Sequence, residues 1–246
     1  MIKIISTRNY AAGEAKVLVS GPAGIGKTRL CATAPDSIII SAEAGLLLLA
    51  DVDISVIEVS SVDDVRNVLN WAKSSTEAKE FKTICLDSIT EIAEVCLTQY
   101  KKDFKDPRAA YGQLQDDVPE LIREFRDLKD KNVYFSAKQS RIEEAEGSVV
   151  KFKAAMPGKY LLANLPYFFD IVLTMRLGKL EDGTIYRYLQ TYSDFQYDCK
   201  DRSDRLAKVE KPDLSYIFKK LEQPRKEEDK GEDKDKDQDE SKKENE

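Results

Sequence analysis

Eight consecutive residues near the start of the chain have the types and the spacing that phosphate binding requires. They fit the pattern G-x-x-x-x-G-K-[ST] and are Gly21, Pro22, Ala23, Gly24, Ile25, Gly26, Lys27 and Thr28. Glycine lets backbone N–H groups point at phosphate oxygens without a clash from a Cβ atom. We therefore expect a P-loop, in which Lys27 reaches the β- and γ-phosphates of ATP and the Thr28 hydroxyl binds Mg²⁺. The alternative interpretation is a glycine-rich turn that only caps a helix.

The residues on either side of this segment predict the elements that must position it. Residues 16–19 are typical of a buried strand, and residues 28–33 are typical of the first turns of a helix. A helix that begins at the loop adds unpaired N–H groups and the positive end of its dipole. The strand, the loop and the helix thus follow one another in the order that the chemistry needs.

The rest of the chain alternates between short apolar strands and amphipathic helices. Strands are predicted at residues 37–41, 54–59, 83–87, 132–137 and 170–175, and helices at residues 63–73, 89–100, 113–128 and 212–221. Residues 177–192 predict a hairpin that turns at Glu181, Asp182 and Gly183. This order predicts an α/β fold with a mainly parallel central sheet, helices on both faces and a late β-hairpin. Such sheets bind their ligands at the carboxyl ends of the strands.

Two acidic residues follow predicted strands and are therefore candidates for the chemistry. Asp87 ends an apolar run, as the Mg²⁺-binding aspartate of the Walker B pattern does. Its alternative role is to cap the helix that begins near Ile89. Glu43 also follows an apolar run, and we expect it to orient and deprotonate the attacking water. The alternative for Glu43 is a solvent-exposed loop residue.

Polar residues also follow the strand predicted at residues 132–137. Gln139 is expected to hydrogen-bond the γ-phosphate and to pass its presence to the next loop, a role for which Lys138 competes. The alternative for Gln139 is an ordinary loop residue.

Together with the P-loop, these residues resemble the core of RecA-like ATPases in type and in order. The resemblance implies that Glu43 is the catalytic glutamate, that Asp87 is followed by the serine typical of the family, and that Gln139 senses the γ-phosphate. It also implies a mobile DNA-binding loop, whose place is taken here by residues 141–159. This segment contains Arg141, Lys151, Lys153 and Lys159, with Phe152 among them and Tyr160 directly after it. Cations and aromatic rings suit single-stranded nucleic acid, and the alternative is a solvated hairpin without a ligand.

A late cationic motif points to assembly. Lys200, Asp201 and Arg202 resemble the K-x-R element of RadA- and DnaB-type relatives, which implies that Lys200 and Arg202 enter the ATP site of an adjacent subunit. Ser203 stands near the place where those relatives usually have a glycine. The alternative is a charged surface turn.

The body of the chain, residues 15–222, resembles the phage RecA-like single-strand annealing proteins of the Sak group. Residues 110–112, 156–159 and 200–202 carry this more specific resemblance. It implies a role in phage recombination, in which a homo-oligomeric ring or filament anneals complementary strands of single-stranded DNA, with a single-strand-binding protein as a partner. The competing hypotheses are a small-molecule P-loop kinase and a non-enzymatic assembly module that ATP switches.

Composition sets the remaining expectations. Residues 1–222 are expected to form one RecA-like ATPase domain, and residues 223–246 a disordered charged tail that accounts for −4 of the net charge of −6. The chain has no histidine, which excludes a Cys/His zinc site and any catalysis by a protein imidazole. Its four cysteines form no C-x-x-C pair, and no apolar run approaches 18 residues. We expect a cytoplasmic protein, in the host cytoplasm if phage-encoded, with no membrane partner.

Overall fold

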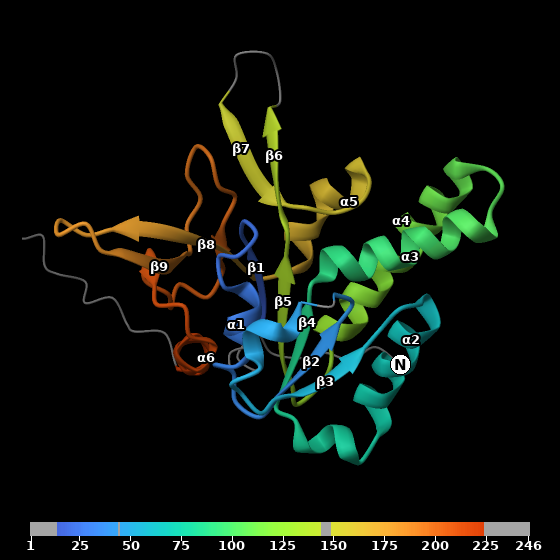
Figure 1. The fold of residues 1–246 in the computed structure, drawn as a ribbon, viewed down its shortest axis with the longest axis horizontal. Coiled ribbons are helices and arrows are strands. Elements are labelled where there is room, and N and C mark those ends of the chain that lie inside the picture. The colour runs from blue at the N-terminus through green and yellow to red at the C-terminus, as the bar shows by residue number, and fades with distance from the viewer. Residues whose placement is uncertain (1–13, 44, 144–148, 224–246) are drawn as a thin grey trace, which may run out of the picture.

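A nine-stranded sheet forms the centre of the protein (Figure 1). The structure is a computed structural model that describes residues 14–43, 45–143 and 149–223. Six neighbouring strands are parallel and comprise β1 (Lys16–Ser20), β2 (Ser37–Ser41), β3 (Ser55–Glu58), β4 (Thr83–Asp87), β5 (Asn132–Ala137) and β8 (Ile171–Lys179). They lie in the order β3-β2-β4-β5-β1-β8, so the strand that leads to the predicted P-loop is inside the sheet.

The later strands run antiparallel to their neighbours. β9 (Ile185–Gln190) forms a hairpin with β8, β10 (Lys200–Asp201) pairs with β8, and β11 (Val209–Glu210) pairs with β9. A separate two-stranded sheet consists of β6 (Gln139–Glu143) and β7 (Val150–Ala154). The prediction of an α/β fold with a mainly parallel sheet and a late hairpin is confirmed. The segment expected as a mobile loop, residues 141–159, contains most of this second hairpin, and its residues 144–148 lie outside the described residues.

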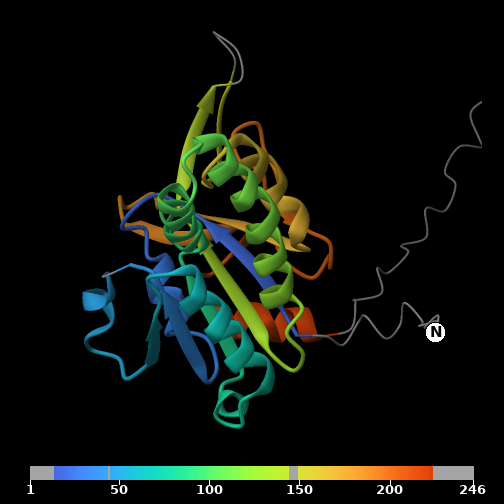
Figure 2. The ribbon, with the colours of Figure 1, turned by 90° about the vertical axis from the view of Figure 1, so that its right-hand side faces the viewer.

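Helices cover both faces of the sheet, because alternate residues of its central strands are apolar on both sides. Leu18 and Phe135 belong to one core, and Val17 and Tyr134 to the other. The first core packs under α2 (Val62–Ser74), α3 (Ile89–Asp103) and α4 (Pro107–Arg126), which Figure 2 shows together on one side. The second packs under α1 (Lys27–Cys31) and α6 (Leu214–Glu222). The shorter elements are α5 (Lys159–Asn164) and the 3-10 helices η2 (Leu46–Leu49), η3 (Glu77–Glu80) and η4 (Leu165–Phe168).

Side-chain caps set the starts of the longer helices. Ser61 accepts a hydrogen bond from the N–H of Asp64 at the start of α2. The predicted helix 113–128 instead begins at Pro107, because Asp106 caps it and a proline suits the first helical position. The predicted start at residue 113 is therefore six residues too late, because no apolar periodicity marks residues 107–112.

The parallel register brings several strand ends to one edge of the sheet. Ser41 at the end of β2 pairs with Asp87 at the end of β4, and Ser20 at the end of β1 pairs with Ala137 at the end of β5. The residues that follow these strands therefore meet at this carboxyl edge. No helix in the described parts of the chain is long and apolar enough to cross a membrane. Most of the expected charged tail, from residue 224 onward, lies outside the described residues.

The core under α4 provides a test of this arrangement. Phe125 of α4 is 1% exposed, so Phe125→Ala should lower the free energy of unfolding by about 3–5 kcal/mol in a denaturant titration. Phe104→Ala is the matched control, since Phe104 is 38% exposed and its loss should cost far less. Equal losses in the two variants would contradict the packing of α4.

Candidate active site

The segment from Gly21 to Thr28 has the backbone shape of a phosphate-binding loop. Gly24 and Gly26 have φ values of 72° and 111°, in the region that favours glycine. The Lys27 ammonium lies inside the loop and donates to the carbonyls of Gly21 at 2.8 Å and Pro22 at 3.0 Å. Because α1 has only five residues, the loop itself and Lys27 are the groups that would hold phosphate, rather than the dipole of a long helix.

Thr28 and Asp87 form a paired oxygen site beside this loop. The Thr28 hydroxyl donates to Asp87 Oδ2 at 2.7 Å, and the Ser136 hydroxyl donates to Asp87 Oδ1. Ser88, rather than Asp87, caps α3 by accepting from the N–H of Glu91, so the alternative capping role for Asp87 is wrong.

This pair fits the predicted metal. A hydroxyl and a carboxylate are hard oxygen donors of the kind that Mg²⁺ prefers, with phosphates and water completing its shell. Among the described residues no group of three acidic or cysteine side chains forms a self-sufficient metal site, so Thr28 and Asp87 would hold Mg²⁺ only together with a nucleotide. Bound there, the ion would neutralise charge on the phosphates.

Glu43 lies next to this pair. Ser88 Oγ donates to Glu43 Oε1 at 3.0 Å, and the backbone N–H of Glu43 donates to Ser41 Oγ at 3.3 Å. The Glu43 side chain is 41% exposed, so solvent reaches its carboxylate. The structure thus places the predicted base beside the residue that follows Asp87, where a carboxylate can accept a proton from water.

Lys138 joins the same group of charges. Its ammonium lies 3.6 Å from Glu43 Oε1 and donates to Glu91, and the Glu91 carboxylate is the main reason that the pKa of Lys138 is raised. Burial lowers the pKa of Lys27, and the positive charge of Lys138 adds to that effect, while Asp87 and Glu43 oppose it. The ammonium of Lys138 therefore contributes to the lowered pKa of Lys27.

Gln139, the residue predicted to sense phosphate, lies beside Lys138 in the chain, but no contact with Glu43 is seen for it among the described residues. It is the first residue of β6, and its Nε2 atom is buried without a hydrogen-bond partner among the described residues. The structure brings Lys138, rather than Gln139, to within 3.6 Å of Glu43. The sensing role of Gln139 stays a prediction.

Lys200 and Arg202 do not join the P-loop of their own chain. Lys200 pairs with Val172 in the amino-terminal half of β8, about 10 Å along the strand from the level of the P-loop. Its ammonium donates to the carbonyl of Pro166 at 2.8 Å, and Arg202 forms an ion pair of 2.9 Å with Asp170. Burial and the Arg202 charge lower the pKa of Lys200. These two cations lie toward the opposite edge of the sheet.

The four predicted nucleic-acid contacts gather around the second hairpin. Arg141 stands opposite Phe152 in the β6–β7 register, whereas Lys151 and Lys153 stand opposite Ile142 and Ser140. Since alternate residues of a strand face opposite ways, Arg141 is on one face of the hairpin and the two lysines are on the other. Lys159 is the first residue of α5 and is exposed. The sequence prediction grouped the four cations together, without this division between faces.

A cavity of about 330 Å³ beside the P-loop contains residues that sequence reasoning missed. It is lined by Gly24, Gly26, Arg29, Leu30, Thr33, Leu48, Met175, Arg187 and Pro212. Arg187 lies so close to the loop that a Cβ on Gly26 would be 3.5 Å from its Nε atom. This mixed apolar and cationic cavity suits the base and sugar of a nucleotide. No motif marks Arg187, which only the β8–β9 hairpin brings to the loop.

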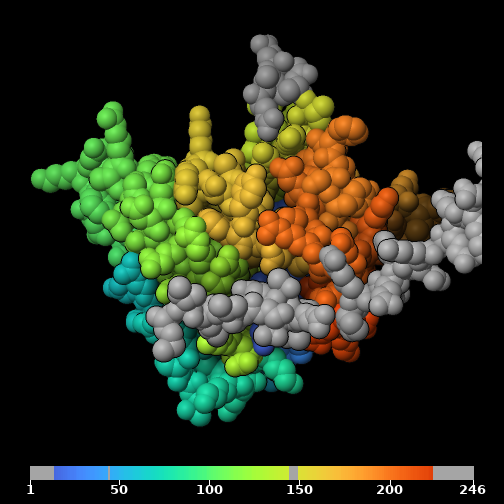
Figure 3. Space-filling model, turned by 180° about the vertical axis from the view of Figure 1, so that it is seen from behind, coloured from blue at the N-terminus to red at the C-terminus, as the bar shows by residue number. Residues whose placement is uncertain are grey.

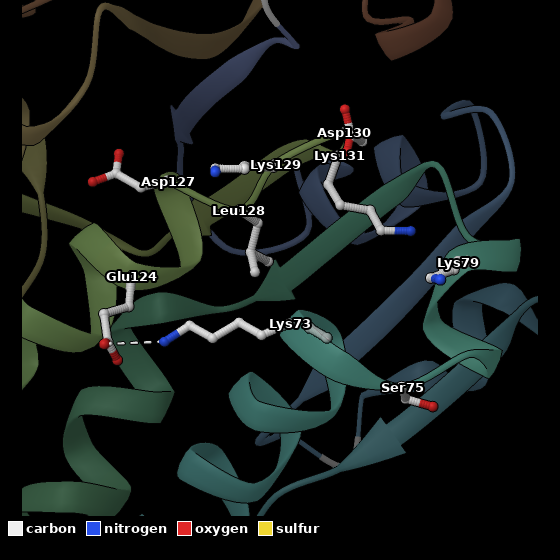
Figure 4. A pocket seen from close by; sticks show the side chains of 10 residues that line it. Lys73, Ser75, Lys79, Glu124, Asp127, Leu128, Lys129, Asp130 and Lys131 are labelled. Carbon is white, nitrogen blue, oxygen red and sulfur yellow. Dashed lines mark ion pairs between the residues drawn. The ribbon is translucent and has the colours of Figure 1, made fainter. Parts of the chain in front are cut away.

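A second hollow, of about 640 Å³, lies near the amino end of β5 (Figure 4). Lys73 and Glu124 form an ion pair of 3.0 Å across it, drawn as a dashed line. The Lys131 ammonium donates to the carbonyls of Ala78 and Phe81. The charged side chains thus connect α2, η3 and α4 at the edge of the sheet away from the P-loop.

The fold and this site define a P-loop nucleoside triphosphatase. The chain belongs to the family whose model is described as "AAA domain", which matches residues 13–203. Solved structures that resemble it include the KaiC-like protein PH0186 from the hyperthermophilic archaeon Pyrococcus horikoshii OT3. That match has 14% sequence identity and a TM-score of 0.38, and it covers 72% of this chain and 78% of the other. No curated protein matches the chain.

The position of Glu43 leads to a test of its role. Glu43→Gln keeps the shape of the side chain but removes the proton acceptor, so ATP turnover should fall by about two orders of magnitude or more while ATP binding persists. Glu58→Gln is the matched control, because Glu58 ends the neighbouring strand β3 and is exposed. Turnover by phosphate release and binding by titration calorimetry measure both effects. Wild-type turnover in Glu43→Gln would assign the base to another residue.

Proposed function

We propose that this P-loop ATPase is a RecA-like recombination protein that binds single-stranded DNA and anneals complementary strands, as the resemblance to the phage Sak group implies. The observation that carries the proposal is the position of Lys138. This residue alone separates β5 from β6, and its side chain reaches Glu43 in the nucleotide site. Lys138 therefore joins the cationic hairpin directly to the proposed catalytic carboxylate of Glu43.

Hydrogen bonds through the Thr90 hydroxyl hold both ends of this hairpin beside the nucleotide site. The N–H of Lys138 donates to Thr90 Oγ1 at 3.0 Å, and Thr90 Oγ1 donates to the carbonyl of Ala155 at 2.8 Å. Thr90 lies in the first turn of α3, two residues after Ser88, which holds Glu43. A strand of DNA that moves the hairpin would thereby act on the partners of Glu43. This supports an ATPase whose rate responds to DNA.

The residues of the site have distinct roles in the proposed hydrolysis. Lys27 and the loop N–H groups hold the phosphates and offset the charge that develops during transfer. Glu43 orients a water and accepts its proton, for which it must be released in part from Lys138. Gln139, whose amide nitrogen has no hydrogen-bond partner in the part of the chain that the structure describes, is proposed to donate to the γ-phosphate.

Assembly is proposed to complete this site. Lys200 and Arg202 lie away from the P-loop of their own chain, so a role in phosphoryl transfer requires a neighbouring subunit. We propose a homo-oligomer in which these cations act on the nucleotide of the next copy, with a single-strand-binding protein as a further partner. The four cysteines are free and buried, which supports a reducing cytoplasm as its location.

The proposal for DNA predicts the effect of removing charge. Replacing Lys151, Lys153 and Lys159 by alanine should weaken binding to single-stranded DNA and flatten its salt dependence, because fewer counterions are released. The matched control replaces the exposed Lys79, Lys105 and Lys129, which lie outside the hairpin and α5. Fluorescence anisotropy with a labelled oligonucleotide across a range of salt concentrations measures both quantities. A wild-type protein that binds no single strand at low salt would contradict the proposed function and favour the small-molecule kinase.

The proposal for assembly predicts rescue between two inactive variants. Lys200→Ala/Arg202→Ala should bind ATP but hydrolyse it slowly, because loss of such cations costs about 10³-fold or more in related sites. Lys27→Ala should also be inactive. Mixing the two unites an intact P-loop with intact cations from the neighbour, so the phosphate-release rate should rise above the sum of the separate rates. No rescue, with a rate per subunit independent of protein concentration, would indicate a monomeric enzyme.

A further inference from the structure

The connection between β9 and β10 displays an aromatic ring on a hydrogen-bonded turn. Phe195 is 87% exposed. Asp194 Oδ1 accepts from the N–H groups of Gln196 at 2.8 Å and Tyr197 at 2.7 Å, and the Asp194 N–H donates to the carbonyl of Tyr197 at 3.0 Å. Gln190 Nε2 donates to the other carboxylate oxygen at 3.0 Å. The backbone on both sides of Phe195 is thus fixed, although its ring lies in solvent.

This turn rests on the hairpin that the proposed function assigns to DNA. The rings of Phe152 and Tyr197 stack with centroids 5.1 Å apart and planes at 17°, and the N–H of Phe152 donates to the carbonyl of Gln196 at 2.7 Å. The segment around Tyr197 therefore extends the β6–β7 sheet by one strand bridge. Figure 1 shows the connection beside β7, and in Figure 3 its orange surface adjoins that of the hairpin.

Arginines lie among these rings. The Arg176 guanidinium is 4.1 Å from the centroid of Tyr197 and 5.8 Å from that of Tyr188, and it also forms an ion pair of 3.4 Å with Asp194. Arg141 pairs with Phe152 in the register, so it belongs to the same face as Phe152 and Tyr197. Aromatic rings with cations among them are typical of surfaces that bind single-stranded nucleic acid.

We propose that Phe195 stacks on an unpaired base of single-stranded DNA, while the exposed Arg141 on the adjoining surface attracts the backbone phosphates. This inference rests on the proposed function, since it identifies a base-contacting residue for the same ligand. The ring of Phe195 is free for stacking, whereas those of Phe152 and Tyr197 already contact each other. Only an unpaired base offers its face to such a ring, because the bases of a duplex are already stacked and paired. The hydrogen-bonded turn reduces the entropy lost on binding, since the backbone is ordered beforehand.

The test compares Phe195→Ala with Phe195→Trp and with Tyr167→Ala, a control at another aromatic residue that is 74% exposed. Binding of a labelled oligothymidine strand is measured by anisotropy from low to moderate salt. Phe195→Ala should bind about tenfold more weakly, while Phe195→Trp and Tyr167→Ala should bind as the wild type does. The salt slope should stay unchanged in Phe195→Ala, because no phosphate contact is lost. A matched abasic strand should bind equally to wild type and to Phe195→Ala.

The outcomes separate this inference from the function on which it rests. If wild type binds the strand and Phe195→Ala binds it equally well, the stacking role is wrong and the DNA-binding function stands. If Phe195→Ala weakens the abasic strand as much as oligothymidine, the ring acts on the fold or the backbone, and the inference is overturned. If wild type binds neither strand at low salt, both proposals fail. Thermal unfolding of each variant confirms that the comparison is between folded proteins.

Discussion

Burial of the central strands on both faces is the constraint on which the rest of the structure depends. In β4 and β5 every residue is buried, so a charged group has no place along most of their length. Chemistry is therefore confined to the positions where strands stop. Asp87 is the last residue of β4 and remains 6% exposed, and its carboxylate is retained there because two hydroxyls, from Thr28 and Ser136, donate to it. The parallel register then sets how closely the residues at the ends of the other strands approach Asp87.

A consequence of this constraint is that Lys138 contacts both the β6–β7 hairpin and the carboxylates beside the P-loop. Lys138 is the first residue after the buried β5, and the chain continues there into the partly exposed β6. Its backbone is held by α3, while its ammonium interacts with both Glu43 and Glu91. The hairpin and the carboxylates beside the P-loop are thus joined by a single short connection.

The sequence sufficed for the parts of the molecule that local chemistry determines. The P-loop, the strand ends at Asp87 and Glu43 and the turn at Gly183 are fixed by residue type and by the alternation of apolar and polar positions. The sequence leaves Lys138 as a competitor to Gln139, because spacing along a chain does not tell which of two adjacent side chains turns toward Glu43. Arg187 was missed for a related reason. It reaches Gly26 through the β8–β9 pairing, a contact between residues far apart in sequence that no local pattern encodes.

The positions of Lys200 and Arg202 have a consequence for any array that this chain builds. They lie toward one edge of the sheet and the P-loop lies at the other, so a contact that unites them joins two different surfaces. Such an interface is head-to-tail, and its repetition gives either a closed ring or an open helix. An open helix has polarity, because one terminal subunit keeps a P-loop that no neighbour covers and the other keeps cations that face no nucleotide. In the proposed assembly, growth and turnover at the two ends would then differ in rate, and the protein would set the direction of the array on the proposed DNA ligand.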